Sequence, residues 1–167
     1  MIKIVGAKGN MRDVDSFLKQ IISFTKKHNF VIQVFNANLI YGKNHLISAT
    51  EHAFRAMKQK TNTTNSLAME ILLYASGERQ LKLAIPKMGI KKGNNNIAFV
   101  FTNSNISDRI VNDVLKQLDL ERDDKVLEGD VNTLKKFGIS KKEIETLRED
   151  KYGHLILEKV ALVDIIK

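Results

Sequence analysis

The spacing of apolar residues along the chain predicts short strands that alternate with helices. Apolar and polar residues alternate over Met1–Val5, and Val31–Phe35 and Ile97–Phe101 have the composition of buried strands. A helix capped by Asp13 carries an apolar stripe that consists of Val14, Phe17, Leu18, Ile21 and Ile22. This alternation favours the α/β (α+β) class, with one domain over residues 1–167 in which a small mixed β-sheet is layered with several α-helices.

Polar and glycine-containing segments separate these elements. We expect a turn at Gly6–Asn10, an irregular exit from the second strand at Asn36–Asn38, a polar connection at Lys91–Asn96 and an edge strand at Lys125–Leu127. A helix beginning near Asn44 has predicted inward residues Leu46, Ala49, Ala53, Phe54 and Met57.

Serine residues mark the starts of two later helices. Ser107 can cap a helix whose apolar residues are Ile110, Val111, Val114, Leu115 and Leu118. Ser140 and Glu143 are spaced as a capping box, and Gly138 closes the short helix before them.

The segment Asn65–Gly89 is the most specific pattern in the chain. Nearly every side chain of Ser66–Ala75 is apolar, so this helix is hydrophobic all round and is expected to be buried. Gly77 lies where a left-handed residue would end it, and Glu78–Gln80 would open the next helix at an exposed corner. A carboxylate at Glu70 is costly there unless it is paired or hydrogen-bonded, so Glu70 and Gly77 are predicted to be structural residues of this corner.

The residues of this segment also resemble a known family. The sequence EILLYASGERQLKLAI, followed by Gly89, is similar to the signature of the KEOPS small-subunit family that includes the PRPK-binding protein, in its archaeal type. The upstream run FNANLIYGKNHLISATEHAFRAM resembles that family's second strand and following helix, so the similarity is clearest over residues 35–101. The chain departs from the family pattern at Pro86, where an ordinary helix former is expected.

The resemblance implies a non-catalytic subunit of the complex that installs threonylcarbamoyl-adenosine beside the tRNA anticodon. In that family the subunit binds the small kinase-like ATPase subunit, meets other KEOPS subunits indirectly, and captures tRNA by its 3′ CCA end. The residues expected to contact this end are Arg79, Gln80, Lys82, Asn38 and Lys43. Taken without the resemblance, Arg79 would form a salt bridge with Glu78 or Glu70, and Asn38 would be a turn residue.

The charge of the chain is unevenly distributed. The net charge is +8, with +4 in residues 1–40, +6 in residues 41–92 and −2 in residues 93–167. A basic excess on part of a domain is typical of a protein with a polyanionic partner, and it also occurs on lysine-rich surfaces that serve only solubility. The alternative function is therefore a pure protein-interaction regulator of a small kinase without direct RNA binding.

The segment His154–Ile166 has too few charged residues for an ordinary surface helix. Its charges, at Glu158, Lys159 and Asp164, do not share one side of a helix. Such a helix either sinks into a groove of its own domain, or covers the core with one side and meets a partner protein with the other. The expected partner-binding residues are Leu155, Leu162, Val163 and Ile166.

No motif in the sequence argues for an enzyme. Gly6–Gly9 lacks the Gly-Lys-Ser/Thr ending of a phosphate-binding loop. His45 and His52 are read as helix-surface residues, because a spacing of seven places them about 10 Å apart along a helix, too far for a zinc pair. We expect no metal and no cofactor. With no cysteine and no apolar run of about 20 residues, the expectation is a cytoplasmic protein without a membrane partner.

Overall fold

Four antiparallel strands form the centre of the molecule. The computed structural model describes residues 1–167 apart from the side chain of Asn94. The strands are β1 (Ile2–Met11), β2 (Val31–Asn36), β3 (Gly93–Thr102) and β4 (Glu121–Arg122). Their order in the sheet is β2-β3-β1-β4, with antiparallel neighbours throughout. The predicted α/β class is confirmed, although the sheet is antiparallel rather than mixed.

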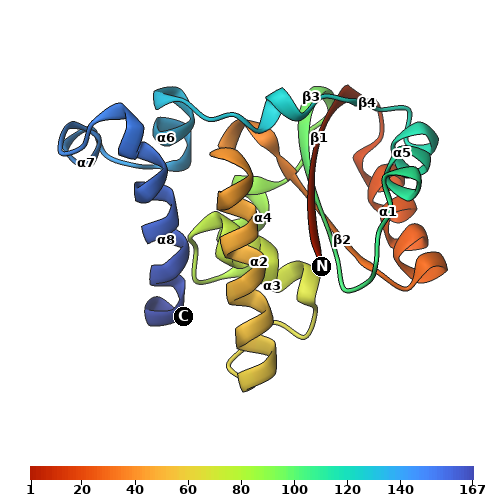
Figure 1. Cartoon of the computed structure of the whole chain (residues 1–167), viewed down its shortest axis with the longest axis horizontal. Coiled ribbons are helices and arrows are strands. Elements are labelled where there is room, and N and C mark those ends of the chain that lie inside the picture. The colour runs from red at the N-terminus through yellow and green to blue at the C-terminus, as the bar shows by residue number, and fades with distance from the viewer.

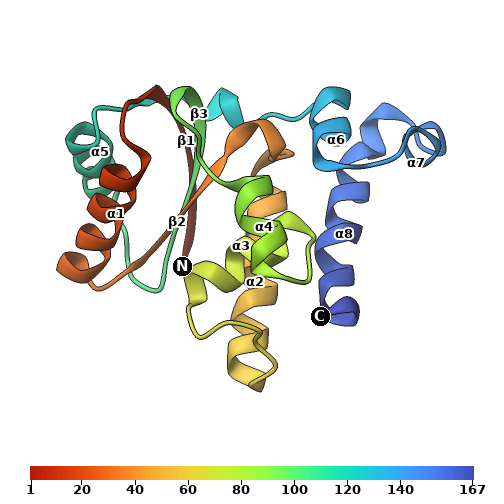
Figure 2. The same cartoon turned by 180° about the vertical axis from the view of Figure 1, so that it is seen from behind.

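Helices cover both faces of this sheet (Figure 1). The helices are α1 (Val14–His28), α2 (Gly42–Gln59), α3 (Leu67–Ser76), α4 (Leu81–Met88), α5 (Asp108–Gln117), α6 (Val131–Phe137), α7 (Lys141–Glu145) and α8 (Tyr152–Ile166), with short 3-10 helices η1 (Ala37–Leu39), η2 (Asp124–Leu127) and η3 (Glu149–Lys151). α1 and α5 lie on one face, α2, α3 and α4 on the other, and α8 lies beyond α2 (Figures 1 and 2). Among the described helices, none combines the length and apolar character needed to cross a bilayer.

The strand β3 is buried on both of its faces. Side chains alternate along a strand, so Phe99 and Phe101 pack with α1 and α5, whereas Ala98 and Val100 pack with α2 and α3. β3 also has a neighbour on each edge, β1 on one side and β2 on the other. This position explains its continuous apolar run, and the prediction of a buried strand at Ile97–Phe101 is confirmed.

The strand β1 continues through the segment where the sequence predicts a turn, so that prediction is wrong. Its pairing with β3 runs from Ile2 to Met11 without interruption. Gly6 allows another segment to approach closely, because a Cβ atom there would lie 2.5 Å from the carbonyl oxygen of Asp123. The N–H of Asp123 donates a 2.9 Å hydrogen bond to the Gly6 carbonyl. The glycine therefore marks a close backbone approach within a strand.

Two other boundaries differ from the predictions. β3 begins at Gly93, within the expected polar connection Lys91–Asn96. The segment Lys125–Leu127 belongs to a 3-10 helix, because the Asp123 side chain caps it by accepting from the Lys125 N–H, and the edge strand is Glu121–Arg122.

The predicted helix caps agree well with the structure. Asp13, Ser107 and Ser140 each accept a hydrogen bond from a first-turn N–H, and Ser66, which was not predicted as a cap, does the same at the start of α3. The complete capping box lies elsewhere, at the start of α6. The apolar stripe of α1 is narrower than predicted, since Leu18 and Ile22 are exposed.

His45 lies in the core and not on a helix surface, which corrects the prediction. Its Nδ1 accepts the Tyr41 N–H at 3.1 Å, and its Nε2 lies 2.8 Å from the Ala75 carbonyl oxygen, to which it donates in this tautomer. Burial lowers the pKa of His45 to about 4, with a smaller contribution from the positive charge of Lys87 and against the effect of the Ala75 hydrogen bond. The neutral imidazole thus links α2 to α3.

This burial predicts a loss of stability in mild acid. The unfolded chain protonates His45 near pH 6.5, whereas the folded protein keeps it neutral to about pH 4, so the stabilisation present above pH 6.5 falls as the pH drops through this window. We expect a loss of about 3 kcal/mol in the free energy of unfolding, measured with urea across that range. His45→Gln should reduce this pH dependence, whereas His154→Gln, at an exposed position, should not. Equal slopes for both variants would contradict the prediction.

Candidate functional site

The corner between α3 and α4 is formed as the sequence predicts. Gly77 ends α3 with φ +70°, and its N–H donates to the Tyr74 carbonyl at 3.1 Å. A Cβ atom at Gly77 would lie 3.3 Å from the Phe137 ring and 3.4 Å from Cβ of Lys159. The corner therefore packs against both α6 and α8, and glycine suits it by conformation and by space.

Lys87 closes this corner from the inside, a role that the sequence analysis missed. Its Nζ donates to the Ser76 carbonyl at 2.7 Å and to Glu78 at 3.3 Å, and it lies 3.9 Å from the centre of the Phe137 ring. Burial lowers the pKa of Lys87, and Glu78 opposes the shift. Glu78 pairs with Lys87, and among the described residues it forms no salt bridge with Arg79.

Arg79 and Lys82 are exposed at the outer side of the corner, with Gln80 half-buried between them. α4 begins at Leu81, later than predicted, and Gln80 is its N-cap residue. The alternative salt bridges of Arg79 are absent among the described residues, since Glu78 pairs with Lys87 and Glu70 with Lys167. Two cationic side chains thus flank the free N–H groups at the start of a helix, an arrangement suited to an anion.

The other two predicted RNA-contacting residues lie in separate places. Asn38, in η1, lines a polar cavity of about 500 Å³ whose other residues are Lys8, Gly9, Asn10, Asn95, Asn96 and Glu121. Lys43 lines a cavity of about 620 Å³ together with three carboxylates, Glu128, Glu149 and Asp150. Neither cavity includes a residue of the α3–α4 corner, so the structure brings Arg79, Gln80 and Lys82 together and leaves Asn38 and Lys43 apart from them.

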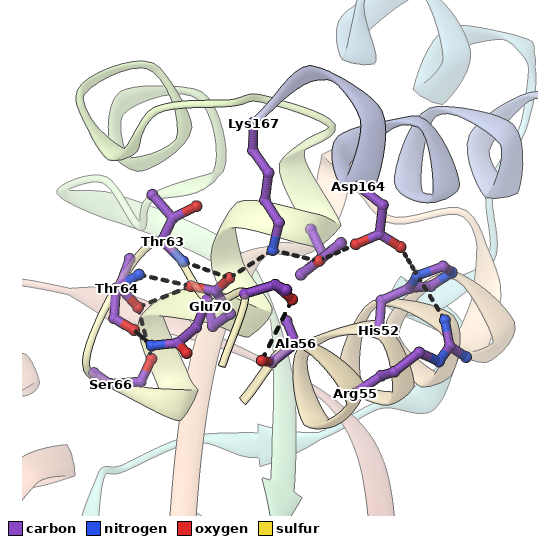
Figure 3. A network of polar contacts seen from close by, with 12 residues as sticks. His52, Arg55, Ala56, Thr63, Thr64, Ser66, Glu70, Asp164 and Lys167 are labelled. Carbon is purple, nitrogen blue, oxygen red and sulfur yellow. Dashed lines mark hydrogen bonds and ion pairs between the residues drawn. The ribbon is translucent and has the colours of Figure 1, made fainter. Parts of the chain in front are cut away.

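Glu70 is completely buried, and both oxygens of its carboxylate accept hydrogen bonds (Figure 3). It accepts hydrogen bonds from the N–H groups of Thr63 and Thr64 at 3.1 and 2.9 Å and from the Thr64 hydroxyl at 3.1 Å. Nζ of Lys167 forms an ion pair with it at 3.2 Å. The expectation that Glu70 accepts hydrogen bonds is confirmed, but the segments it fixes are the loop before α3 and residue 167, rather than the Gly77 corner.

A polar network continues from this ion pair to α2 (Figure 3). Lys167 Nζ also donates to the Tyr74 hydroxyl at 2.6 Å, and that hydroxyl donates to Asp164, which His52 contacts at 3.0 Å. Burial and Asp164 together raise the pKa of Tyr74. Burial would raise the pKa of Asp164 as well, but the hydrogen bonds from Tyr74 and His52 outweigh it and lower that pKa. This network, invisible to sequence spacing, holds the last turn of α8 against α2 and α3.

The end of α8 presents only part of its expected partner surface. Leu155 and Val163 lie in the domain's own core, with exposed fractions of 6% and 0%, so they are unavailable to a partner in this structure. Leu162 is half-buried, whereas Ile166 is 46% exposed and Ile165, which the sequence analysis left out, is 78% exposed. The exposed apolar surface is therefore the last turn of α8.

The described residues contain no cluster of three or more His, Cys, Asp or Glu side chains that could hold a metal ion. The cavities next to Asn38 and Lys43 are open and polar, and no buried nucleophile with a neighbouring base lines either of them. The cationic corner and the exposed end of α8 are two surface features whose chemistry suits binding.

Comparison with known proteins identifies the class of protein to which this fold and these surfaces belong. The family model described as Kinase binding protein CGI-121 matches residues 10–164, and the chain belongs to this family. A curated relative, the Regulatory protein Cgi121 of Methanocaldococcus jannaschii, is 33% identical over 138 residues, which cover 81% of this chain and 84% of that protein. The resemblance stated from the sequence is thereby confirmed at the level of the family.

The Glu70–Lys167 pair yields a stability prediction. Lys167→Met would leave a buried carboxylate without its cation, and removal of one partner of a buried pair costs about 3 kcal/mol or more. Urea unfolding at neutral pH measures this loss. The control is Lys141→Met, which removes an exposed pair with Glu145 and should change stability by about 0.5 kcal/mol or less.

The double variant Glu70→Gln with Lys167→Met buries no charge and should recover part of the loss. A double variant that is less stable than Lys167→Met alone would contradict the ion-pair account.

Proposed function

We propose that this chain is a non-catalytic subunit of a KEOPS-type tRNA-modifying complex, which binds the kinase-like ATPase subunit and recruits tRNA through its 3′ CCA end. Membership in a family of kinase-binding proteins supports the protein partner. The observation that carries the RNA part is the exposed pair of cations, Arg79 and Lys82, at the α3–α4 corner, where the carboxylate of Glu78 already pairs with Lys87.

The chemistry of the corner fits the end of a single strand. A guanidinium such as that of Arg79 can bind a phosphate through two parallel hydrogen bonds, and Lys82 adds a second positive charge. The first N–H groups of α4 favour an anion at the same place. The Gln80 amide supplies both a donor and an acceptor for a base edge.

Asn38 and Lys43 are also proposed to contact the RNA, but their surroundings suit this role unequally. The amide of Asn38 lies in a cavity lined mainly by other amides and suits an unpaired base. The three carboxylates that share a cavity with Lys43 weaken its attraction for a phosphate. We therefore place the RNA end first at Arg79, Gln80 and Lys82.

The proposed kinase-binding surface is the exposed last turn of α8. Ile165 and Ile166 form an apolar patch with the half-buried Leu162 beside it. The buried ion pair of Lys167 and the hydrogen bonds of Asp164 hold this turn in place. An ordered apolar patch is the kind of surface that a partner protein covers.

End capture of tRNA predicts a strong and local effect of one substitution. Arg79→Glu should weaken binding of full-length tRNA by about tenfold or more, because it places a negative charge beside the phosphate. The control is Arg109→Glu, the same charge change at an exposed position of α5, which should weaken binding much less. The measurement is a filter-binding titration at two salt concentrations.

The same titration with tRNA that lacks its CCA end separates the two functions. Under the proposal this RNA should bind much more weakly than full-length tRNA, by more than three lost phosphates explain. Equal binding of both RNAs, or equal effects of the two arginine variants, would leave a general basic surface and favour the pure protein-interaction regulator.

The proposed kinase interface predicts different effects for substitutions at exposed and at buried residues of α8. Ile165→Glu should leave the stability of the isolated chain within about 0.5 kcal/mol and abolish co-elution with the kinase-like subunit of the same organism. Val163→Glu should unfold the chain, because it buries an unpaired charge. Ile22→Glu, exposed on α1, is the matched control and should still co-elute. Co-elution of the Ile165→Glu variant would move the interface elsewhere.

A further inference from the structure

An apolar groove runs beside the strand β2, far from the end of α8. It has a volume of about 590 Å³, and its walls come from α1 on one side and from α3 and α4 on the other. Figure 2 shows β2 crossing between these helices. The residues of this β2 groove are Val14, Leu18, Gln33, Val34, Met69, Leu72, Ile85, Pro86, Gly89, Ile90 and Lys91.

The floor of the β2 groove is an open edge of the sheet. β2 is the outer strand and pairs only with β3 among the described residues. In an antiparallel ladder the residues whose N–H and C=O groups point away from the partner alternate along the strand. The Val34 N–H points away from β3, because it donates to a side chain on the open edge of β2. The Ile32 N–H, two residues earlier on the same strand, therefore points to the open edge as well.

The side chain of Gln33 covers part of this edge. Its Oε1 accepts the Val34 N–H at 2.8 Å, and its Nε2 donates to the Ala68 carbonyl at the start of α3 at 2.9 Å. The carboxamide thus stands where a peptide group of a neighbouring strand would stand. An edge guarded by one flexible side chain can exchange that side chain for a real strand.

Large apolar side chains are exposed along the rim of the β2 groove. Leu18 is 40% exposed on α1, and Ile85 is 46% exposed on α4. A strand laid against β2 would direct alternate side chains toward the α1 wall and the α3–α4 wall. The hydrogen-bonding edge selects an extended backbone as the occupant, and the two walls select apolar side chains.

The net positive charge of the part of the chain that forms the groove favours an occupant with acidic side chains. The walls of the groove come from residues 14–91, and residues 1–92 carry fifteen Lys and Arg against five Asp and Glu, a net charge of +10. Lys91 is the one charged residue among the described residues that line the groove. An acidic segment is therefore attracted, and a second copy of this basic chain is repelled.

We propose that the β2 groove binds an extended segment of another protein, with apolar side chains at alternate positions and acidic side chains between them, as an added strand of the sheet. Such strand addition combines backbone hydrogen bonds for affinity with side-chain pockets for specificity. The inference does not depend on the RNA or kinase proposals, because it uses neither the α3–α4 corner cations nor the end of α8.

The test uses a fluorescent eight-residue peptide in which Asp or Glu alternates with Val or Ile, titrated against the full chain by anisotropy. We expect binding with a Kd on the order of 10 μM. Ile85→Glu should weaken it by about tenfold, whereas Leu83→Glu, equally exposed on the same helix but outside the groove, should change it by less than about twofold. Absence of binding up to about 1 mM, or equal effects of the two variants, would overturn the proposal.

Two further measurements test strand addition itself. The peptide should slow hydrogen exchange of the Ile32 amide by about tenfold, and the same peptide N-methylated at alternate residues should neither bind nor protect. Equal binding of the methylated peptide would overturn the proposal. Arg79→Glu should leave peptide binding unchanged. An RNA ending in CCA that displaces the peptide and itself depends on Ile85 would also overturn it, since the groove would then hold RNA.

Discussion

The buried carboxylate of Glu70 is the constraint on which the arrangement of the α2, α3 and α8 side of the molecule depends. A charge with no exposed surface is tolerated only when it is paired and hydrogen-bonded, and Glu70 meets this condition with Thr63, Thr64 and Lys167. These partners come from the loop before α3 and from residue 167, so one side chain joins segments more than one hundred residues apart. The ion pair thereby holds the last turn of α8, which carries Ile165 and Ile166, against α3.

The same reasoning explains why the corner cations stay available. At the α3–α4 corner Glu78 pairs with Lys87, and the buried Glu70 at the start of α3 pairs with Lys167. Both internal lysines are at least half-buried, whereas Arg79 and Lys82 are exposed. The domain thus neutralises its own carboxylates with one set of cations and presents another set to solvent. Lys87 and Lys167 therefore serve stability, whereas Arg79 and Lys82 are left for the RNA binding that we propose.

The sequence predicted the features that depend on local chemistry. Helix caps at Asp13 and Ser107 and the left-handed end of α3 at Gly77 follow from neighbouring residues, and all three predictions are correct. Features that depend on contacts between distant segments could not be predicted from the sequence. Glycine at position 6 predicts a turn, but a distant backbone segment, around Asp123, gives it another reason to be there.

The site residues divide in the same way. The resemblance and the local pattern located the corner, and Glu70 was predicted to be hydrogen-bonded. The burial of His45, Leu155 and Val163 and the partners of Lys87 and Lys167 depend on which helices meet, which no spacing rule contains. Asn38 and Lys43 were grouped with Arg79 by sequence, and the fold placed them apart.

The central position of β3 has a consequence for how the chain folds during synthesis. β3 pairs with β1 over residues that are about ninety positions earlier in the sequence, and with β2 about seventy positions earlier. Neither pairing can begin until β3, which starts at Gly93, emerges from the ribosome, so β1 and β2 stay unpaired and partly apolar while α1 to α4 are made. Sheets closed by such distant partners fold slowly. During the interval before β3 emerges, the apolar side chains of β1 and β2 have no sheet to pack in.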